Sequence, residues 1–196
     1  MSPRYRLLAP EGWDRIPLDE RAERAVNRIV ERQFRGIDDA PHLRAELRGS
    51  LLDQVRQAAE VGGREMFLSS VMVGPMPLQS TLLVTELDGD PAVDDSEVLG
   101  ELALLLREDA GVESARVAEH PAGRAQRRVR IEPAASAESH DTLVVEWYLV
   151  APGGASIVLL TFSTFLLPIR EAFETLFDVV ASSVRWRSAV TVPASG

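Results

Sequence analysis

The chain has 196 residues, with 21 basic and 30 acidic side chains and therefore a formal net charge of -9. All 21 basic residues are arginine, and the sequence contains neither lysine nor cysteine. These absences exclude disulfide scaffolds, thiolate metal sites, Schiff-base enzymes and P-loop nucleotide hydrolases that use their own lysine. The negative charge disfavours a nucleic-acid binder, which needs an electropositive surface. With 45% hydrophobic residues, the composition is typical of a globular protein.

Two short strands and a helical hairpin are predicted for the first third of the chain. The strands cover residues 5–8 and 13–18. Asp19 is the predicted N-cap of a first helix, because apolar residues recur at helical spacing after it. A second helix is predicted to begin at Pro41, since proline is favoured at the first helical position. We expect these two helices to form a hairpin over about residues 19–63.

The middle of the chain changes from helical to strand periodicity. Residues 65–73 and 78–87 predict two antiparallel strands, because a glycine- and proline-rich turn separates two apolar runs. An acidic loop follows at residues 88–95. A third helix is predicted to begin near Val98 and to end before Gly111.

The second half predicts a meander of strands closed by a helix. In the third of these strands, Leu143, Val145 and Trp147 alternate with other residues and should share one face of a sheet. The last helix is predicted over about residues 168–183, and residues 189–196 are expected to form a flexible tail. The predicted strands of this half are residues 112–119, 126–132, 142–150 and 156–164.

The order of these elements predicts an α+β protein. We expect an antiparallel sheet of about six strands, with helices on both faces, which is an α/β/α sandwich. No internal repeat or linker divides the sequence, so residues 1–188 are expected to form a single domain.

Neither a signal peptide nor a membrane span is expected. The first ten residues contain only a short apolar run, which is shorter than the apolar region of a signal peptide. The longest apolar stretch, residues 157–167, is well below the roughly 20 residues that a membrane helix needs. The sequence therefore predicts a cytoplasmic protein.

The histidines and serines do not form a recognisable catalytic motif. His42, His120 and His140 lack the spacing of metal ligands. His140 precedes Asp141, which suggests a candidate base, although neighbours in a strand usually point apart. Ser156 follows two glycines but lies in a predicted hairpin loop, and not in a nucleophile elbow. We expect no catalytic residue among them.

The acidic loop is a candidate cation site, because closely spaced carboxylates are ligands for Ca²⁺ or Mg²⁺. An EF-hand loop needs an acceptor at its fifth position and glycine at its sixth, where this loop has Ala92 and Val93. The favoured interpretation is a solvated turn at a helix N-terminus, so no metal or other cofactor is predicted. The carboxylates concerned are Asp88, Asp90, Asp94, Asp95 and Glu97.

The candidate partner-binding site is a cluster of arginines. It lies in the strand predicted at residues 126–132 and just before that strand. Arg128 and Arg130 alternate with apolar residues and should project from one sheet face. The favoured interpretation is an exposed edge strand that its charges protect from aggregation. The alternative is contact with an acidic protein partner, because guanidinium groups bind carboxylates well. The cluster consists of Arg124, Arg127, Arg128 and Arg130.

Two segments resemble the Mog1/PsbP-like superfamily. Pro10-Glu11-Gly12-Trp13, followed by Ile16-Pro17-Leu18, is similar to the first sheet strand of that superfamily. Leu159 to Thr164, followed by Phe173 to Asp178 and Arg185-Trp186, resembles its last strand and closing helix. The resemblance is strongest to uncharacterised actinobacterial members, and an arginine-only, alanine-rich composition fits a GC-rich genome.

This resemblance implies an antiparallel sheet between helices over most of the chain. The superfamily includes a Ran-binding nuclear factor, a photosystem II extrinsic subunit and chaperones of type VI secretion effectors, which bind protein partners without catalysis. The present sequence departs from them in its two long N-terminal helices, residues 19–63, and no partner-binding residue can be transferred by position.

The sequence thus predicts a non-enzymatic cytoplasmic protein that binds another protein as an adaptor or chaperone, in a secretion or multiprotein system. A self-associating homodimer that uses the helical hairpin is one alternative. A small-ligand binder or enzyme is another, and it predicts a pocket between sheet and helices that is lined by His140, Arg128 or the acidic loop.

Overall fold

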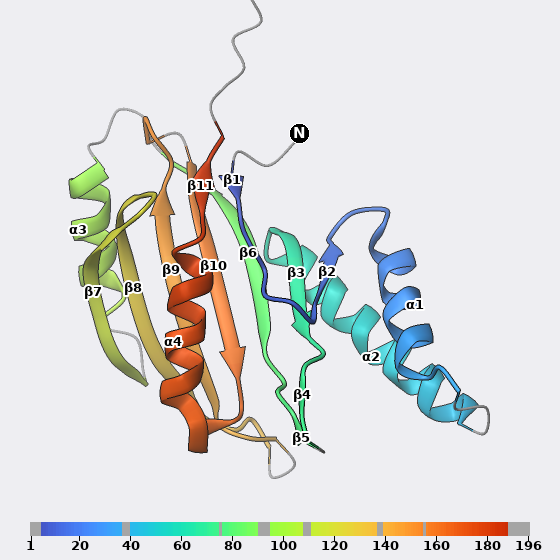
Figure 1. Ribbon diagram of the computed structural model, residues 1–196. Helices are drawn as coiled ribbons and strands as arrows, with labels where there is room; N and C mark the ends of the chain where they lie inside the picture. The colour runs from blue at the N-terminus through green and yellow to red at the C-terminus, as the bar shows by residue number, and fades with distance from the viewer. Residues whose placement is uncertain are drawn as a thin grey trace, which may run out of the picture.

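The computed structural model describes residues 5–36, 40–74, 76–89, 95–107, 111–136, 139–154 and 156–187. One wide antiparallel sheet runs through the molecule, and helices cover parts of both of its faces (Figure 1). The α+β sandwich predicted from the sequence is therefore confirmed at the level of its layers.

The sheet contains seven strands in the order β2-β3-β6-β10-β9-β8-β7, and all neighbours are antiparallel. The sequence predicts about six strands; the sheet is wider because the short segment β2 pairs along β3 and extends it at one edge. The strands are β2 (Trp13–Pro17), β3 (Gly63–Ser69), β6 (Thr81–Asp88), β7 (Val112–His120), β8 (Gly123–Glu132), β9 (Thr142–Val150) and β10 (Ser156–Thr164).

One face of the sheet is closed by the C-terminal helix α4 (Arg170–Ala181), which follows a single 3₁₀ turn, η1 (Leu167–Ile169), and packs on β9 and β10. Strand alternation places the apolar side chains of β9 and β10 on this face, where they meet the helix. Phe177 is fully buried and stacks on Phe162, with ring centroids 4.9 Å apart. This face holds the larger hydrophobic core of the protein.

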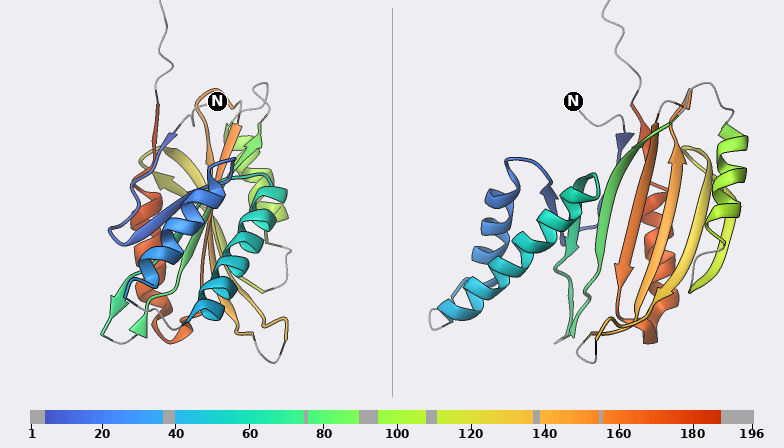
Figure 2. Two further views of the ribbon diagram at one scale, coloured as in Figure 1. Left: turned by 90° about the vertical axis from the view of Figure 1, so that its right-hand side faces the viewer. Right: turned by 180° about the vertical axis from the view of Figure 1, so that it is seen from behind.

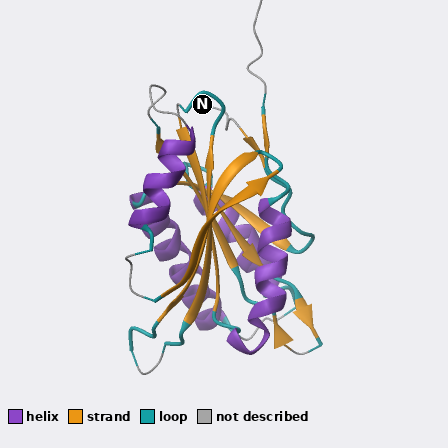
Figure 3. Ribbon diagram, turned by 90° about the vertical axis from the view of Figure 1, so that its left-hand side faces the viewer, coloured by secondary structure: helices purple, strands orange, loops and turns teal. Residues whose placement is uncertain are grey.

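The opposite face carries the other three helices. Helices α1 (Ala22–Gln33) and α2 (Pro41–Glu60) pack on β2 and β3, whereas α3 (Asp95–Leu105) packs on β7 and β8. Figures 2 and 3 show α4 across the sheet from these helices. The smaller core lies beneath α1 and α2, where Val26 and Leu51 pack against Ile16 and Met66.

The predicted helical hairpin is present, but its first helix starts later than predicted. Helix α1 begins at Ala22 with Arg21 at the N-cap position, so the prediction that Asp19 caps it is wrong. Asp19 instead accepts a hydrogen bond from the Arg21 backbone amide (2.9 Å) in the preceding turn. Arg48 of α2 ties the two helices together through hydrogen bonds to Asn27 (2.7 Å) and Glu23 (2.6 Å).

Two small sheets complete the fold. Strand β1 (Tyr5–Arg6) pairs with β11 (Arg185–Trp186), and β4 (Met72–Val73) pairs with β5 (Met76–Pro77). Tyr5 is buried, and its hydroxyl donates a 2.7 Å hydrogen bond to Glu65 of β3. The first and last strands are therefore held together beside the main sheet (Figure 1).

Two predicted segments fall outside the described residues. They are the tail at residues 189–196 and residues 90–94 of the acidic loop.

The strands predicted at residues 142–150 and 156–164 match β9 and β10 in both boundaries.

Candidate functional site

The central strands β6 and β10 carry a strip of partly exposed side chains on the face opposite α4. On this face α2 contacts β3 and α3 contacts β7 and β8, so the helices flank the two central strands (Figure 2). Leu87 is 37% exposed, and the rest of the strip is half-buried. We call this surface the open strip; its members are Thr81, Leu83, Leu87, Ile157, Leu159, Thr161 and Ser163.

The open strip changes in polarity along its length. At one end Leu87 lies opposite Ile157 in the strand register, which makes that end apolar. At the other end Thr81 lies opposite Ser163, and their hydroxyl groups are hydrogen bonded at 2.5 Å. The strip can therefore contact apolar groups at one end and hydrogen-bonding groups at the other.

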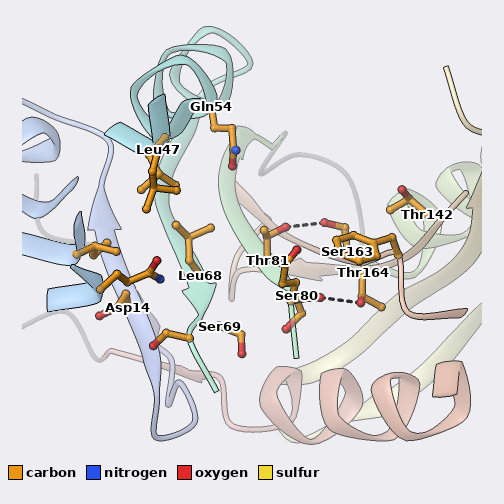
Figure 4. A pocket seen from close by; sticks show the side chains of 16 residues that line it. Asp14, Leu47, Gln54, Leu68, Ser69, Ser80, Thr81, Thr142, Ser163 and Thr164 are labelled. Carbon is orange, nitrogen blue, oxygen red and sulfur yellow. Dashed lines mark hydrogen bonds between the residues drawn. The ribbon is translucent and has the colours of Figure 1, made fainter. Parts of the chain in front are cut away.

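A cavity of about 410 Å³ lies at the hydroxyl end, between the helical hairpin and the sheet (Figure 4). Its volume is within the range of pockets that hold small molecules or single side chains of a partner. Thr81 and Ser163 line the cavity, so it continues the open strip. The apolar lining comes from Ile29, Leu47, Leu51, Leu68 and Phe165.

The polar lining of the cavity consists almost entirely of hydroxyl and carboxamide groups. Two of them are held by bonds within the fold, each at 2.8 Å: Ser70 donates to the Gly12 carbonyl, and Thr164 donates to the Gln79 carbonyl (Figure 4). These bonds orient the Ser70 and Thr164 side chains. The groups are Ser69, Ser70, Ser80, Thr81, Thr142, Ser163, Thr164, Gln33, Gln54 and Gln79.

Ser80 differs from its neighbours because its hydroxyl is buried without a partner. The residue is 5% exposed, and its Oγ makes no hydrogen bond to any described residue. An unpaired buried hydroxyl costs about 1–3 kcal/mol, because its hydrogen bonds to water are lost on folding. A ligand that hydrogen bonds to Ser80 would remove this cost.

The cavity has almost no charge. Among the described residues that line it, Asp14 alone is charged, and its carboxylate forms an ion pair with Arg32 of α1. The same described residues include no arginine or histidine. The arrangement therefore favours an uncharged ligand with both donors and acceptors.

The catalytic candidates from the sequence do not line this cavity. His140 lies beside it, with its ring 5.6 Å from the ring of Phe165 at the rim. Ser156 is buried at the start of β10, whereas the cavity lies at the end of that strand. Across the part of the chain that the structure describes, no group of three or more His, Asp or Glu side chains is placed to hold a metal ion.

The interpretation of the arginine cluster as a charged edge strand is wrong. Strand β8, which carries it, lies between β7 and β9 inside the sheet, because β7 pairs along its free side. Arg124 lies at the start of β8 with a side chain that is more than half exposed, 4.0 Å from Glu119. Of the four arginines it is the most accessible, so the predicted contact with a partner depends mainly on it.

Arg127 points toward α4 and is almost fully buried. Its Nε donates to Asp178 (2.8 Å) and its terminal nitrogen donates to Glu174 (3.1 Å). Trp147 donates its indole N–H to the same Asp178 carboxylate (3.0 Å). These bonds attach α4 to the sheet, so the role of Arg127 lies within the fold.

Arg128 and Arg130 share the other face, as the alternation predicts. Arg128 forms a buried ion pair with Glu146 of β9 and lies 3.4 Å from the Tyr148 hydroxyl. The Arg130 Nε lies 3.8 Å from the same carboxylate. The pairing of β8 with β9 therefore places opposite charges side by side in the sheet, which sequence analysis missed because the register was unknown.

One signal in the sequence could have indicated the cavity. Strand β10 has an apolar middle and four hydroxyl residues toward its ends, Ser156, Thr161, Ser163 and Thr164; the two that alternate are Thr161 and Ser163. Alternation places them on one face, and a hydroxyl row within an apolar strand is typical of a surface that is not fully covered.

These features define the protein as an α+β sandwich with an antiparallel sheet, one face closed by α4 and one face that carries an uncharged, partly exposed strip. Among solved structures, the fold is similar to LpqN, a protein involved in cell envelope biogenesis of Mycobacterium tuberculosis. The two chains are 14% identical with a TM-score of 0.50, and the similarity covers 92% of this chain and 82% of LpqN. At that identity the similarity shows the fold alone. No protein-family model matches the sequence, and a search of curated proteins found no match.

Within the described residues, no helix has both the length and the apolar character that crossing a membrane requires.

Proposed function

We propose that this chain is a non-enzymatic adaptor or chaperone, which holds an uncharged segment of a partner protein on the open strip. The observation that carries the proposal is the continuity of the strip with the neutral cavity, through Thr81 and Ser163. The similarity to a protein of envelope biogenesis is compatible with such a role.

A polypeptide segment fits the polarity of this surface. Its backbone offers amide donors and carbonyl acceptors, and serine and threonine hydroxyls can both donate and accept. Apolar side chains of the segment would contact Leu83 and Leu159 on the strip. Each Å² of apolar surface that this contact removes from water would stabilise the complex by about 25 cal/mol. Charged side chains would be disfavoured in the cavity, since Asp14 is already paired.

The absence of catalysis is part of the proposal. A general acid, base or nucleophile needs a titratable or activated group facing the substrate. The cavity offers Asp14, which is held in an ion pair, and hydroxyl groups with no histidine among the lining residues.

We also propose that the protein acts in the cytoplasm, as the sequence predicts. A partner in the envelope is the alternative that the similarity to LpqN supports. Cell fractionation with an antibody against the native protein distinguishes the two compartments.

Site-specific photo-crosslinking tests the proposed binding surface. Phe165 lies at the rim of the cavity and is 40% exposed, so the aromatic photo-crosslinker p-benzoylphenylalanine can replace it with little disturbance. We expect irradiation of cells to attach a partner protein at position 165, and mass spectrometry to locate the crosslink in an uncharged segment.

The matched control is Val179, which is exposed on α4 and faces away from the cavity. The same crosslinker there should not capture this partner. Equal capture at both positions, or crosslinks to highly charged segments, would contradict the proposal.

A neutral small molecule is the second candidate ligand, favoured by the cavity volume of about 410 Å³. Native mass spectrometry of protein purified from its own host should then show a bound mass that the cavity-filling variant Ser163→Trp loses.

Self-association is tested by light scattering, where a homodimer shows twice the monomer mass at tens of micromolar.

A further inference from the structure

Helix α3 presents leucine to solvent. Leu104 and Leu105 are each 67% exposed, whereas Leu99 and Leu106 are buried against the sheet. At 100° per residue, the exposed pair lies on the side of the helix opposite the buried pair. A helix that only covers a sheet has a polar outer face, so this second apolar face is unexplained by the fold.

Acidic side chains share this outer face. Glu97 and Glu101 are exposed and lie two turns and one turn, respectively, before the leucine pair, within about 100° of it around the helix. No ion pair among the described residues engages either glutamate. Other carboxylates of the fold, such as Glu113 and Glu174, pair with arginine.

The surrounding sequence concentrates the charge of the protein. Residues 88–109 contain eight acidic residues and one arginine, which gives a net charge of -7 out of -9 for the whole chain. Such a concentration creates a local negative potential that attracts a positively charged partner and increases its rate of association.

We propose that the outer face of α3 is a docking surface for a basic amphipathic helix of a partner protein. Charge complementarity specifies this occupant: arginine or lysine side chains would pair with Glu97 and Glu101, while apolar side chains of the same helix pack on Leu104 and Leu105. The four residues follow the i, i+4, i+7, i+8 spacing by which one helix packs on another.

This surface is distinct from the cavity of the proposed function. Helix α3 lies over β7 and β8, and the cavity lies between α2, β3 and the ends of β6 and β10. A partner can therefore use one surface without the other, and variants of each surface test them separately.

Fluorescence anisotropy with a labelled synthetic peptide tests the proposal on the full chain. The probe is an amphipathic 18-residue helix of leucine and lysine, and its control is the same peptide with glutamate in place of lysine. We expect the basic peptide to bind at micromolar concentration in low salt, and L104S/L105S to weaken binding at least tenfold. The variant should keep its melting temperature because both leucines are exposed.

Three further measurements make the outcome decisive. V179S, which changes an equally exposed apolar residue on α4, should bind the peptide as the unmodified protein does. E97Q/E101Q should weaken binding and reduce its salt dependence. Unchanged affinity in L104S/L105S would overturn the proposal, because generic charge attraction would then explain binding. Light scattering that shows a leucine-dependent dimer would also overturn it, by assigning the surface to a second copy.

Discussion

The two faces of the central sheet differ in how completely helices cover them, although the same strands form both. The face beneath α4 is closed by stacked aromatic rings and by ion pairs that attach the helix to the sheet. Among the described residues, the opposite face is covered at its two sides, by α1 and α2 on one side and by α3 on the other, and β6 and β10 stay partly exposed between them. The difference is that the larger hydrophobic core lies on one face, whereas the other face keeps the partly exposed strip to which we assign the proposed binding.

Truncating the aromatic core should have the largest effect. Phe177→Ala removes a fully buried ring that stacks on Phe162, so we expect a loss of about 3–5 kcal/mol in the free energy of unfolding. Leu159→Ala on the open strip is the matched change on the other face and should cost about 1 kcal/mol. Urea denaturation measures both, and equal losses would remove the distinction between the faces.

Breaking the buried ion pair beneath α3 should be nearly as costly. Glu146→Leu leaves the Arg128 guanidinium buried without its carboxylate, and we expect a loss of about 3 kcal/mol. The double variant Arg128→Met/Glu146→Leu should recover most of that loss, since an apolar pair of similar size needs no charge partner. A double-mutant cycle in urea gives the coupling free energy between Arg128 and Glu146. If the losses of the two single variants add up in the double variant, the ion pair contributes nothing to stability.

Acid should weaken the closed face through His120. Burial lowers the pKa of its imidazole from the ordinary value of 6.5, and the neutral ring accepts from the Ala122 amide while donating to the Ala181 carbonyl. The unfolded state therefore binds the proton more readily. Stability from this group is fully present above pH 6.5 and is lost as the pH falls through the lower folded pKa.

The measurement is the free energy of unfolding between pH 5 and pH 8 for the protein and for His120→Gln. We expect stability to rise more steeply with pH in the unmodified protein. Identical pH profiles would show that His120 does not titrate differently in the folded state.

The smallest effects should come from the cavity. Thr164→Val removes the hydrogen bond to the Gln79 carbonyl and the one from the Leu166 amide, and should cost about 1–2 kcal/mol. Ser80→Ala removes a hydroxyl without a described partner, so its effect on the free energy of unfolding should be close to zero or slightly stabilising. Thermal denaturation compares the two; a clear loss for Ser80→Ala would mean that its hydroxyl is bonded after all.

Much of the fold could be predicted from periodicity. Residues 142–150 and 156–164 are rich in apolar, β-favouring residues and lie between loops of small and polar residues, which predicted both boundaries of β9 and β10; the apolar stripe with Phe173 and Phe177 indicated a helix packed across them. These segments are predictable because their side chains are buried on a regular pattern. Asp19 was misplaced as an N-cap because its carboxylate bonds within the turn before α1.

The candidate site was much less predictable, because it depends on pairing between distant segments. Strand β6 lies between β3 and β10, and only this order brings Thr81 beside Ser163. The arginine cluster shows the same limit: alternation predicted that Arg128 and Arg130 share a face, but periodicity could not show that β7 covers the edge. The spacing of apolar residues along the sequence can predict a single strand. The residues of a site can be predicted only when the neighbouring strands in the sheet are known.

The short pairing of β1 with β11 has a mechanical consequence. Tyr5 lies opposite Trp186, so a pulling force applied through the two ends of the described chain is borne first by a two-residue ladder. That ladder can open one bond at a time, before load reaches the long strands of the main sheet. Strands β1 and β11 lie at the upper end of the molecule in Figure 1, whereas β4 and β5, whose neighbours Ser70 and Gln79 line the cavity, lie at the lower end. A fluorophore or handle joined through β1 or β11 should therefore leave the proposed binding surface free for single-molecule measurements.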